Sequence, residues 1–454
     1  MKKHTQSPYE SSKVSYKPSG IEWLGEIPQS WEIVKIKQVS KVVTGKTPCL
    51  ENEWGNEMPF ITPTDCFLDT KYTSLSQRKL SKIGIKNYNS IIIPQDSILV
   101  TCIASIGKVV MSNKEVITNQ QINSVIPNTD LISPDFAFYV LLVTMPFAEN
   151  YFCGYSILPI LNKSEFSNIK IPLPPLQEQK EIAEFLDSKC EKIQNYIDKK
   201  QKLITLLQEK KQALINEAVC GRVACHTADS HCHTERSEVS TTAYKDRGIE
   251  YLGLIPHHWE VTNLKNIVSI KSGGTPSRDN KDYWNGDIPW IRSEFCHNQH
   301  IFQCDVKEKI TTLGLQKSSA KMCEKNTILI ALVGATIGQV AFLNFKSAIN
   351  QNIAAIYPNN AAILDNVFLF FVALTFKQRF EILGKYAIAN LAFIGNLKIP
   401  LPPLQEQKEI AAFLDSKVAQ IDSVIEKTKK QIELIKEYKN TLINEAVCGR
   451  IRVN

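Results

Sequence analysis

The chain has 454 residues, of which 43% are hydrophobic and 22% charged, and its formal net charge is +7. This length exceeds one ordinary hydrophobic core, so we expect two or more globular domains. Residues 1–13 have no apolar stretch typical of a signal peptide. The longest purely apolar run, 367–374, is far shorter than the roughly 20 residues of a membrane span. We therefore expect neither a secreted nor a membrane protein, and we interpret the 12 cysteines, which lack framework spacing, as reduced thiols of a cytoplasmic protein.

The chain repeats itself in order. After a polar tail over residues 1–19, the segment GIEWLGEIP at 20–28 is answered by GIEYLGLIP at 248–256. Four further pairs follow: TGKTP at 44 with SGGTP at 272, MPFI at 58 with IPWI at 288, IGK at 106 with IGQ at 337, and NQQI at 119 with NQNI at 350. The halves differ almost everywhere between these anchors. This pattern predicts two related domains, at 20–170 and 247–398, with similar scaffolds and dissimilar surfaces.

Each domain is expected to mix strands and helices. The β-branched runs 90–93, 97–100 and 327–330 are bounded by polar or turn residues and predict strands. The apolar stretches 136–145 and 367–376 are typical of buried helices, although periodicity does not separate them from strands. The predicted fold class is therefore α+β.

A long helix is predicted after each domain. Residues 171–189 and 399–417 differ at one of 19 positions, Glu184 against Ala412, and both segments close on LINEAVCGR, at 214–222 and 442–450. Prolines block helix before about Gln177, and Gly221 and Gly449 end the helices. The helical spacers are thus placed at 171–222 and 399–454. Their apolar residues recur in steps of three and four, as in a coiled-coil seam: Ile182, Leu186, Ile193, Ile197, Ile204, Leu207 and Leu214, and Ile410, Leu414, Ile421, Ile425, Ile432, Ile435 and Leu442.

The matched seams indicate that the two helices pair with each other. We expect an antiparallel coiled coil of roughly 60 Å, with one domain at each end and a pseudo-two-fold axis between them. The alternative is that each helix packs only on its own domain.

Residues 223–246 are polar and are expected to form a flexible linker. Cys225, His226, His231, Cys232 and His233 suggest a metal site, but their spacing fits no zinc pattern. We therefore predict no metal site in this chain.

No catalytic motif is present. Gly45-Lys46-Thr47 lacks the upstream glycine of a phosphate loop, because position 40 is Ser40. There is no GxGxxG or HExxH motif, and no two carboxylates can be paired as acid and base. The sequence therefore favours recognition over catalysis.

The positive charge lies outside the helices. Residues 178–218 hold eight acids and eight bases, and residues 406–446 hold eight acids and seven bases, so the rest of the chain carries the surplus. This distribution suits a polyanionic partner. The Gly-x-Thr-Pro turns, each followed by a tryptophan (Trp54 or Trp284), and the polar strand ends are expected to contact DNA bases or phosphates. The candidates are Lys46, Thr47, Thr62, Thr64, Lys79, Lys82, Asn119, Gln120, Gln121, Gly274, Thr275, Ser277, Arg278, Arg292, Ser293, Lys317, Lys321, Asn350, Gln351 and Asn352. Alternatively, the Asn/Gln clusters cap strands or satisfy buried backbone groups, and the lysines and arginines are solvated surface charges.

The order of parts resembles the specificity subunit of type I restriction-modification systems. The resemblance rests on the start segments, the Gly-x-Thr-Pro turns, the nearly identical helix starts and the LINEAVCGR ends, and it covers nearly the whole chain. It implies that each domain reads one half of a bipartite site in double-stranded DNA and that the coiled coil sets the gap. It also implies a non-catalytic subunit that docks two modification subunits and restriction subunits. S-adenosylmethionine, ATP and magnesium would belong to those partners, and this chain would hold no cofactor.

Other interpretations stay open. A coiled-coil scaffold without a DNA role would have neutral globular domains, whereas the domains here hold the positive surplus. A fused nuclease or methyltransferase would show a cofactor loop, and an inactive or phase-variable specificity subunit would share every feature above. Individual DNA contacts cannot be carried over from the family.

Overall fold

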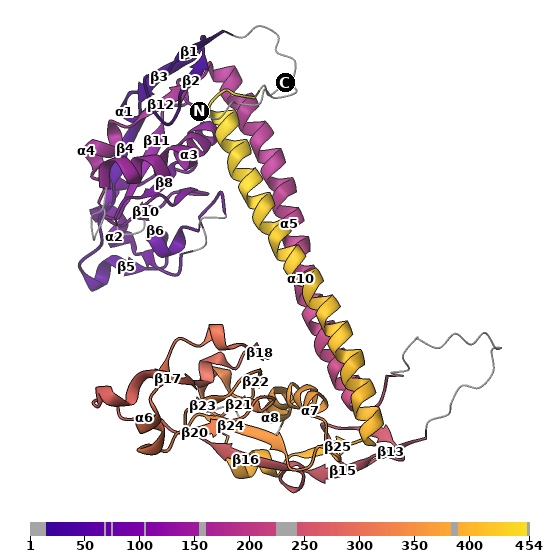
Figure 1. The fold of residues 1–454 in the computed structure, drawn as a ribbon. Helices are drawn as coiled ribbons and strands as arrows, with labels where there is room; N and C mark the ends of the chain where they lie inside the picture. Colours follow the sequence, from indigo (N-terminus) through magenta and orange to yellow (C-terminus); the bar gives the residue numbers. More distant parts are fainter. Residues whose placement is uncertain are drawn as a thin grey trace, which may run out of the picture. The chain divides into compact units, whose positions relative to one another are not determined.

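A computed structural model of the chain describes residues 15–67, 70–73, 76–103, 106–153, 160–223, 243–382 and 389–451. The linker cysteines and histidines lie outside these residues. The chain divides into two compact units, one formed by residues 1–200 and 431–454 (unit 1) and the other by residues 201–430 (unit 2). Each unit therefore contains one globular domain and parts of both long helices (Figure 1).

Unit 1 holds two four-stranded sheets, in the orders β4-β11-β8-β9 and β10-β6-β7-β5, and two strand pairs, β1-β2 and β12-β3. Its strands are β1 Tyr16–Pro18, β2 Glu26–Pro28, β3 Glu32–Lys35, β4 Ser40–Thr44, β5 Trp54–Gly55, β6 Met58–Ile61, β7 Lys79–Leu80, β8 Ile98–Thr101, β9 Val109–Met111, β10 Ile117–Thr118, β11 Ile122–Pro127 and β12 Lys170–Leu173. Its shorter helices are α1 Ile36–Val39, α2 Lys82–Asn87, α3 Pro134–Cys153 and α4 Lys163–Ser167. Helix α3 packs on β8, β9 and β12.

Unit 2 repeats this plan. Its sheets have the orders β16-β24-β21-β22-β18 and β19-β17-β23-β20, with the pairs β13-β14 and β15-β25. The strands are β13 Tyr244–Asp246, β14 Leu254–Pro256, β15 Glu260–Asn263, β16 Val268–Ser272, β17 Trp284–Ile291, β18 Gln299–Ile301, β19 Lys309–Ile310, β20 Lys321–Cys323, β21 Ile328–Ala331, β22 Val340–Leu343, β23 Ser347–Ile349, β24 Ile353–Pro358 and β25 Lys398–Leu401. The shorter helices are α6 Thr312–Gln316, α7 Asn366–Ala373, α8 Phe376–Ile382 and α9 Leu391–Gly395. The fold is mixed α/β with long helices.

Most of the elements predicted within the domains are present. The runs at 97–100 and 327–330 correspond to β8 and β21, and the apolar stretches correspond to α3 and to α7 with α8. The strand predicted at 90–93 was wrong. Residues Asn89–Ile91 form a 3-10 turn directly after α2, and Ile93 makes only an isolated bridge to Val116. Ile91 and Ile92 pack on the small core formed by Phe60, Leu80, Tyr88 and Ile117, and Ile93 is buried in the neighbouring core with Ile61 and Val116. Burial alone therefore explains the composition of this run.

Each long helix begins and ends where its prolines and glycine place it. Helix α5 is Leu176–Val219 and helix α10 is Leu404–Val447, 44 residues each. Gly221 and Gly449 have φ values of 69° and 68°. The amide of the residue after each glycine, Arg222 or Arg450, donates to a carbonyl five residues back. These bonds cap carbonyls that the last turn leaves unpaired, and the left-handed glycine makes them possible.

The LINEAVCGR ends pack on the start segments in the same way in both units. In unit 1, the Tyr16 hydroxyl donates to the Gly449 carbonyl at 3.0 Å, and Pro28 and Trp31 fill the space beside that glycine. In unit 2, Tyr244 donates to Gly221 at 3.0 Å, and Pro256 and Trp259 take the corresponding positions. In each unit, the end of one long helix and the start segment of the domain thus form the same structural junction.

The predicted seam residues are buried or half-buried. In unit 1 the fully buried members are Ile182, Leu186, Ile193, Ile197, Ile432 and Leu442, and in unit 2 they are Ile204, Ile410, Leu414 and Ile425. Leu207, Leu214, Ile421 and Ile435 are half-buried. Near the ends, Ile215 and Ile443 are more deeply buried than the neighbouring leucines of the predicted seam.

Candidate nucleic-acid interface

The Gly-x-Thr-Pro turn lies directly on the Asn/Gln turn of its own unit. A Cβ on Gly45 would sit 2.1 Å from the carbonyl oxygen of Thr118, and one on Gly273 would sit 1.8 Å from that of Ile349. Only glycine permits this approach of two backbones. The glycine of each turn is therefore a packing requirement rather than a phosphate-binding feature.

The same side-chain hydrogen bond joins the two turns in both units. The Thr47 hydroxyl donates to Gln120 Oε1 at 2.6 Å, and the Thr275 hydroxyl donates to Gln351 Oε1 at 2.6 Å. The Asn/Gln turn is in turn fixed to the strand end, because Asn119 and Asn350 donate their backbone N–H to the last residues of β6 and β17. The turn, the amide cluster and the strand end thus form one surface in each unit, which we call the turn platform.

The two asparagines that begin the amide clusters are buried. Asn119 Oδ1 accepts from the backbone N–H of Gln121 at 3.1 Å, and Asn350 Oδ1 accepts from that of Asn352 at 3.1 Å. Asn119 also donates from Nδ2 to Gln121 Oε1 at 2.9 Å. These amides shape the turn, as in the structural alternative considered for the clusters, and Gln120 and Gln351 are the members exposed at the surface.

The platform of unit 1 combines lysines and hydroxyls with one carboxylate, Asp65, which accepts from the Thr62 hydroxyl at 2.8 Å. Lys46 is exposed, and its ammonium lies 5.9 Å from the centre of the Tyr88 ring. The hydroxyls of Thr62 and Thr64 are 2.8 Å apart at the end of β6. Lys79 lies in β7 and Lys82 opens α2. A hollow of about 500 Å³ beside them is lined by Trp54, Gly55, Gln77, Arg78 and Lys79.

A buried carboxylate holds the loop behind this platform. Glu53 accepts hydrogen bonds from the backbone N–H groups of Cys49 and Leu50, both at 3.0 Å, and from Asn87 Nδ2 at 3.0 Å. The bond from Asn87, followed by that from Leu50, lowers the pKa of Glu53. The carboxylate therefore stays ionised and fixes the loop that leads into β5.

The platform of unit 2 has a different chemistry. The Arg278 guanidinium lies 3.8 Å over the Trp284 ring and donates to Glu308 Oε2 at 3.0 Å. Arg292 pairs with Glu294, and its Nη1 lies 3.9 Å from Glu308 Oε1. Two arginines and two carboxylates thus alternate along this surface.

The remaining candidates of unit 2 lie around the same turn. Ser319 contacts Gly274, and Lys317 and Lys321 lie on either side of it. Lys321, in β20, pairs with Ile349, the residue before the Asn/Gln turn. Ser277 is exposed, and its carbonyl accepts from Trp284 Nε1 at 2.9 Å. Ser293 begins the 3-10 turn that follows Arg292.

Sequence reasoning missed the residue that faces each strand end. Arg78 and Glu308 have equivalent positions, since their carbonyls accept from the backbone N–H groups of Phe60 and Trp290. A signal for them was present: each lies 18 residues after its aromatic residue and directly before a Lys-Leu or Lys-Ile pair. Aligning the halves through this weak anchor would have identified both positions.

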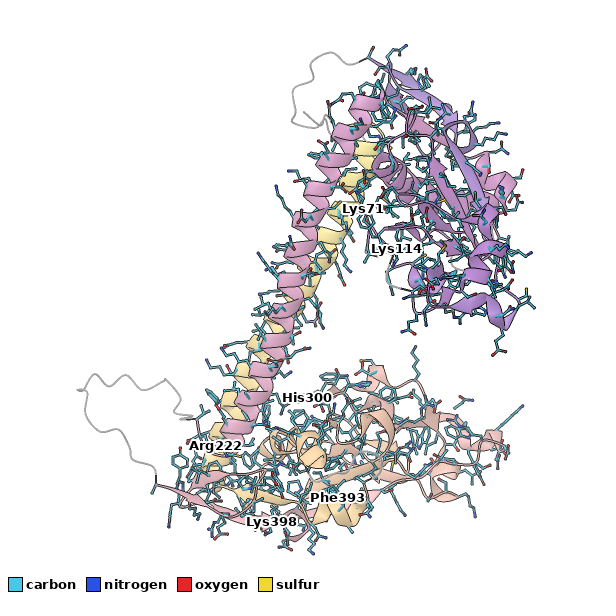
Figure 2. All side chains as sticks on the ribbon, turned by 180° about the vertical axis from the view of Figure 1, so that it is seen from behind. Lys71, Lys114, Arg222, His300, Phe393 and Lys398 are labelled. Atoms are coloured by element: carbon cyan, nitrogen blue, oxygen red, sulfur yellow. The ribbon has the colours of Figure 1, made fainter. Side chains whose placement is uncertain are left out.

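The domain of unit 1 is fastened to α5 by a charged cluster. Lys71, labelled in Figure 2, lies 2.6 Å from Asp187 and 2.7 Å from Asp135, and the Tyr139 hydroxyl donates to Asp187 at 2.6 Å. Burial disfavours the Lys71 ammonium, but the two carboxylates outweigh this effect and raise the pKa of Lys71. The cluster borders a cavity of about 350 Å³ that also touches Lys439 of α10.

The unit 2 counterpart of this cluster is weaker. His300, also labelled in Figure 2, packs its ring against Phe342 and Phe370. It also interacts electrostatically with Asp415. Burial raises the pKa of Asp415, and His300 partly opposes this shift. Equivalent positions therefore carry an ion pair in one unit and a less favourable carboxylate in the other.

The described residues offer no metal centre, and burial keeps two of their thiols protonated. Within the described ranges, no cluster of three or more His, Cys, Asp or Glu residues could hold a metal ion. Cys66 and Cys296 are buried free thiols. Burial raises the pKa of Cys66 and of Cys296 to about 12, which makes them unreactive. In the same part of the chain, no helix has the length and apolarity to cross a bilayer.

A family model and related proteins place this chain in the same family. The family model of the type I restriction modification DNA specificity domain matches residues 28–208 and 256–434. The putative type I restriction enzyme MjaX specificity subunit of Methanocaldococcus jannaschii is 29% identical over 451 residues, which cover 95% of this chain and 96% of that protein. The MjaIX specificity subunit of the same organism is 25% identical over 441 residues, covering 95% of each chain.

Two solved structures share the fold. A chain from a structure of a type I R-M system, 16% identical, superposes with a TM-score of 0.68 over 94% of this chain and 99% of its own. The HsdS subunit of Thermoanaerobacter tengcongensis, 17% identical, gives a TM-score of 0.50 over 94% and 98%. With two copies of the family domain, one in each half, the chain belongs to the type I restriction-modification DNA specificity family.

Proposed function

We propose that the chain is the non-catalytic, sequence-specific DNA-binding subunit of a type I restriction-modification complex. In this proposal the domain of each unit reads one half of a bipartite site, and the domains extend over residues 20–170 and 247–398. One observation carries it: the same turn hydrogen bond builds the platform in both units, while the strand-end residues differ, Thr62 against Arg292. Equal scaffolds with unequal polar groups are what the reading of two different base sequences requires.

The long helices would set the gap between the half-sites. Contacts within the units favour an antiparallel pair: in unit 2 Lys211 of α5 donates to Asp422 of α10 at 2.7 Å, and in unit 1 Cys190 of α5 and Lys439 of α10 line the same cavity. As α5 advances from 190 to 211, its neighbours in α10 recede from 439 to 422. Helices of 44 residues span about 66 Å, somewhat under two turns of DNA at about 34 Å each. We propose that they pair as a coiled coil with pseudo-two-fold symmetry.

The partners follow from this assignment. We propose that the chain binds double-stranded DNA in the cytoplasm and docks two modification subunits and restriction subunits. S-adenosylmethionine, ATP and magnesium would act in those subunits. Of the linker predicted at 223–246, residues Tyr244–Asp246 form β13 and pair with β14. We propose that the part of the linker before Tyr244 connects the two halves.

Adenine-methylation mapping tests the function. The chain would be expressed with its modification partner, and the genomic DNA sequenced for modified adenines. A new bipartite motif with a fixed, non-specific gap is the expected result. The absence of a new motif, with expression of the partner confirmed, would reject the assignment as an active specificity subunit.

A further inference from the structure

The platform of unit 2 contains a set of side chains that its counterpart lacks. Arg278 and Arg292 flank Glu308, and Trp284 supports the flat face of Arg278. These side chains are open to solvent: 53% of Arg278, 40% of Arg292 and 34% of Glu308 is exposed. We call these three residues the arginine clamp.

Arg278 leaves hydrogen-bond donors free for a ligand. A guanidinium has five N–H donors in a rigid fork, and Arg278 uses only Nη2 toward Glu308. Stacking on Trp284 and pairing with a carboxylate fix the plane of the fork, which lowers the entropy lost on binding. An arginine fixed in this way is suited to a planar partner with two adjacent acceptors.

The internal repeat separates reading groups from scaffold groups. The Thr–Gln bond between the turns is the same in both units, so it cannot by itself distinguish two different half-sites. The strand-end pair differs completely: Thr62 and Arg78 in unit 1 correspond to Arg292 and Glu308 in unit 2. Backbone geometry is retained there while size and charge change, which is the behaviour of a specificity position.

We infer that Arg278 and Arg292 read guanine in the half-site of the second domain, and that Glu308 is a positioning residue which orients both. The inference rests on the proposed function. Guanine presents O6 and N7 as two adjacent acceptors in the major groove, and arginine is their usual bidentate partner. A carboxylate on a DNA-facing surface repels phosphate, so Glu308 weakens non-specific binding while it fixes the arginines.

Base preference in the second half-site tests the clamp. The full chain, assembled with its modification partner, would be measured against duplexes in which each base pair of the mapped motif is varied. Arg292→Thr installs the residue of the first domain, and Arg292→Lys keeps the charge but removes the fork. Each should reduce discrimination at a guanine by roughly 5- to 150-fold, as expected for losing one bidentate contact. Preferences in the first half-site should not change.

Glu308→Gln distinguishes a role of Glu308 in orienting the arginines from a role in the stability of the domain. It should lower discrimination at the same guanines while tightening binding to unrelated DNA, because one negative charge near the phosphates is lost. A purely structural role would weaken binding to all duplexes equally. Lys309→Gln, at the exposed neighbouring position, is the matched control and should leave base preferences unchanged.

Several outcomes would overturn the inference. A second half-site without a G·C pair would do so at once, as would unchanged base preferences in Arg292→Lys and in Arg278→Ala. Equal loss of affinity for every duplex would identify phosphate contacts instead. If the wild-type complex yields no bipartite motif, the proposed function itself fails. A motif that forms but is insensitive to the clamp refutes only the clamp.

Discussion

A buried glutamine in each helix start is predicted to hold the recognition domain on its helix. Gln179 is fully buried in unit 1 and makes three hydrogen bonds to backbone groups. Its Nε2 donates to the carbonyls of Leu131 at 3.1 Å and Pro174 at 2.8 Å, and its Oε1 accepts from the Ser133 amide at 2.8 Å. Gln407 repeats the arrangement in unit 2 with Ile363, Pro402 and Asp365.

Gln179→Met keeps the length of the side chain and removes all three bonds. Two of the three bonds are fully buried, and a buried polar group left unpaired costs about 1–3 kcal/mol. We therefore expect the local opening free energy to fall by about 2–6 kcal/mol. At the lower end of this range, amide exchange at the junction should accelerate roughly 30-fold.

Hydrogen exchange measured by mass spectrometry on the full chain reads this effect directly, because the Ser133 amide is itself bonded to Gln179. Gln179→Met should expose Ser133 to exchange and leave Asp365 protected, and Gln407→Met should do the reverse. The control is Gln177→Met, which loses only an exposed bond to Glu181 and should stay within about 0.5 kcal/mol of the wild type. Unchanged protection of Ser133 in Gln179→Met would refute the reasoning.

Three further predictions concern the spacing, the modularity and the pH response. Deleting residues 196–202 from α5 and 430–436 from α10 shortens an antiparallel helix pair by about 10 Å. Methylation mapping should then show a gap between the half-sites that is about three base pairs shorter, or no site at all. An unchanged gap would exclude the helices as the spacer. Replacing residues 20–170 with the first domain of another family member should change one half-site of the mapped motif, and changes in both would exclude modular reading. Because burial raises the pKa of Asp415, its ionised form destabilises the folded state at neutral pH, and stability is regained as the pH falls through the raised pKa. Asp415→Asn should therefore slightly raise the melting temperature at pH 7 and have no effect below about pH 3, where both states are protonated. The effect at pH 7 is small because much of the Asp415 side chain stays open to solvent, so that only part of its charge is desolvated.

The sequence predicted the repeated parts of this fold well, because a segment that occurs twice marks the equivalent residues of the two domains. Two features follow from local chemistry, and both are present. They are the helix ends at Gly221 and Gly449 and the helices formed by the apolar stretches of the domains. The strand expected at 90–93 failed because its isoleucines pack on two cores from a 3-10 turn and the two residues after it, and burial does not distinguish this conformation from a strand. The repeat also marked the Gly-x-Thr-Pro and Asn/Gln anchors, and the structure adds that they lie together in both units.

What the sequence could not predict was which polar groups are already used. Asn119 and Gln121 form a candidate pair for adenine contacts by residue type, yet their amides are bonded to each other. Glu308 attracted no attention because a single carboxylate between strands is ordinary, and its role depends on two arginines 30 and 16 residues away. Hydrogen-bond partners of this kind depend on tertiary placement, which no local pattern encodes.

The duplication within this chain provides a control that a single domain lacks. Where both units make the same contact, as Gln179 and Gln407 do, the contact serves what the domains share, namely their attachment to the helix. Where one backbone position carries Thr62 in one unit and Arg292 in the other, folding alone does not account for the residue, because the strand end has the same geometry with either. Under the proposed function, the reading of a different base sequence by each domain accounts for such differences. Under the proposed function, Thr62 and Arg78 are the first domain's counterparts of Arg292 and Glu308, and exchanging them for arginine and glutamate should change base preference in the first half-site only.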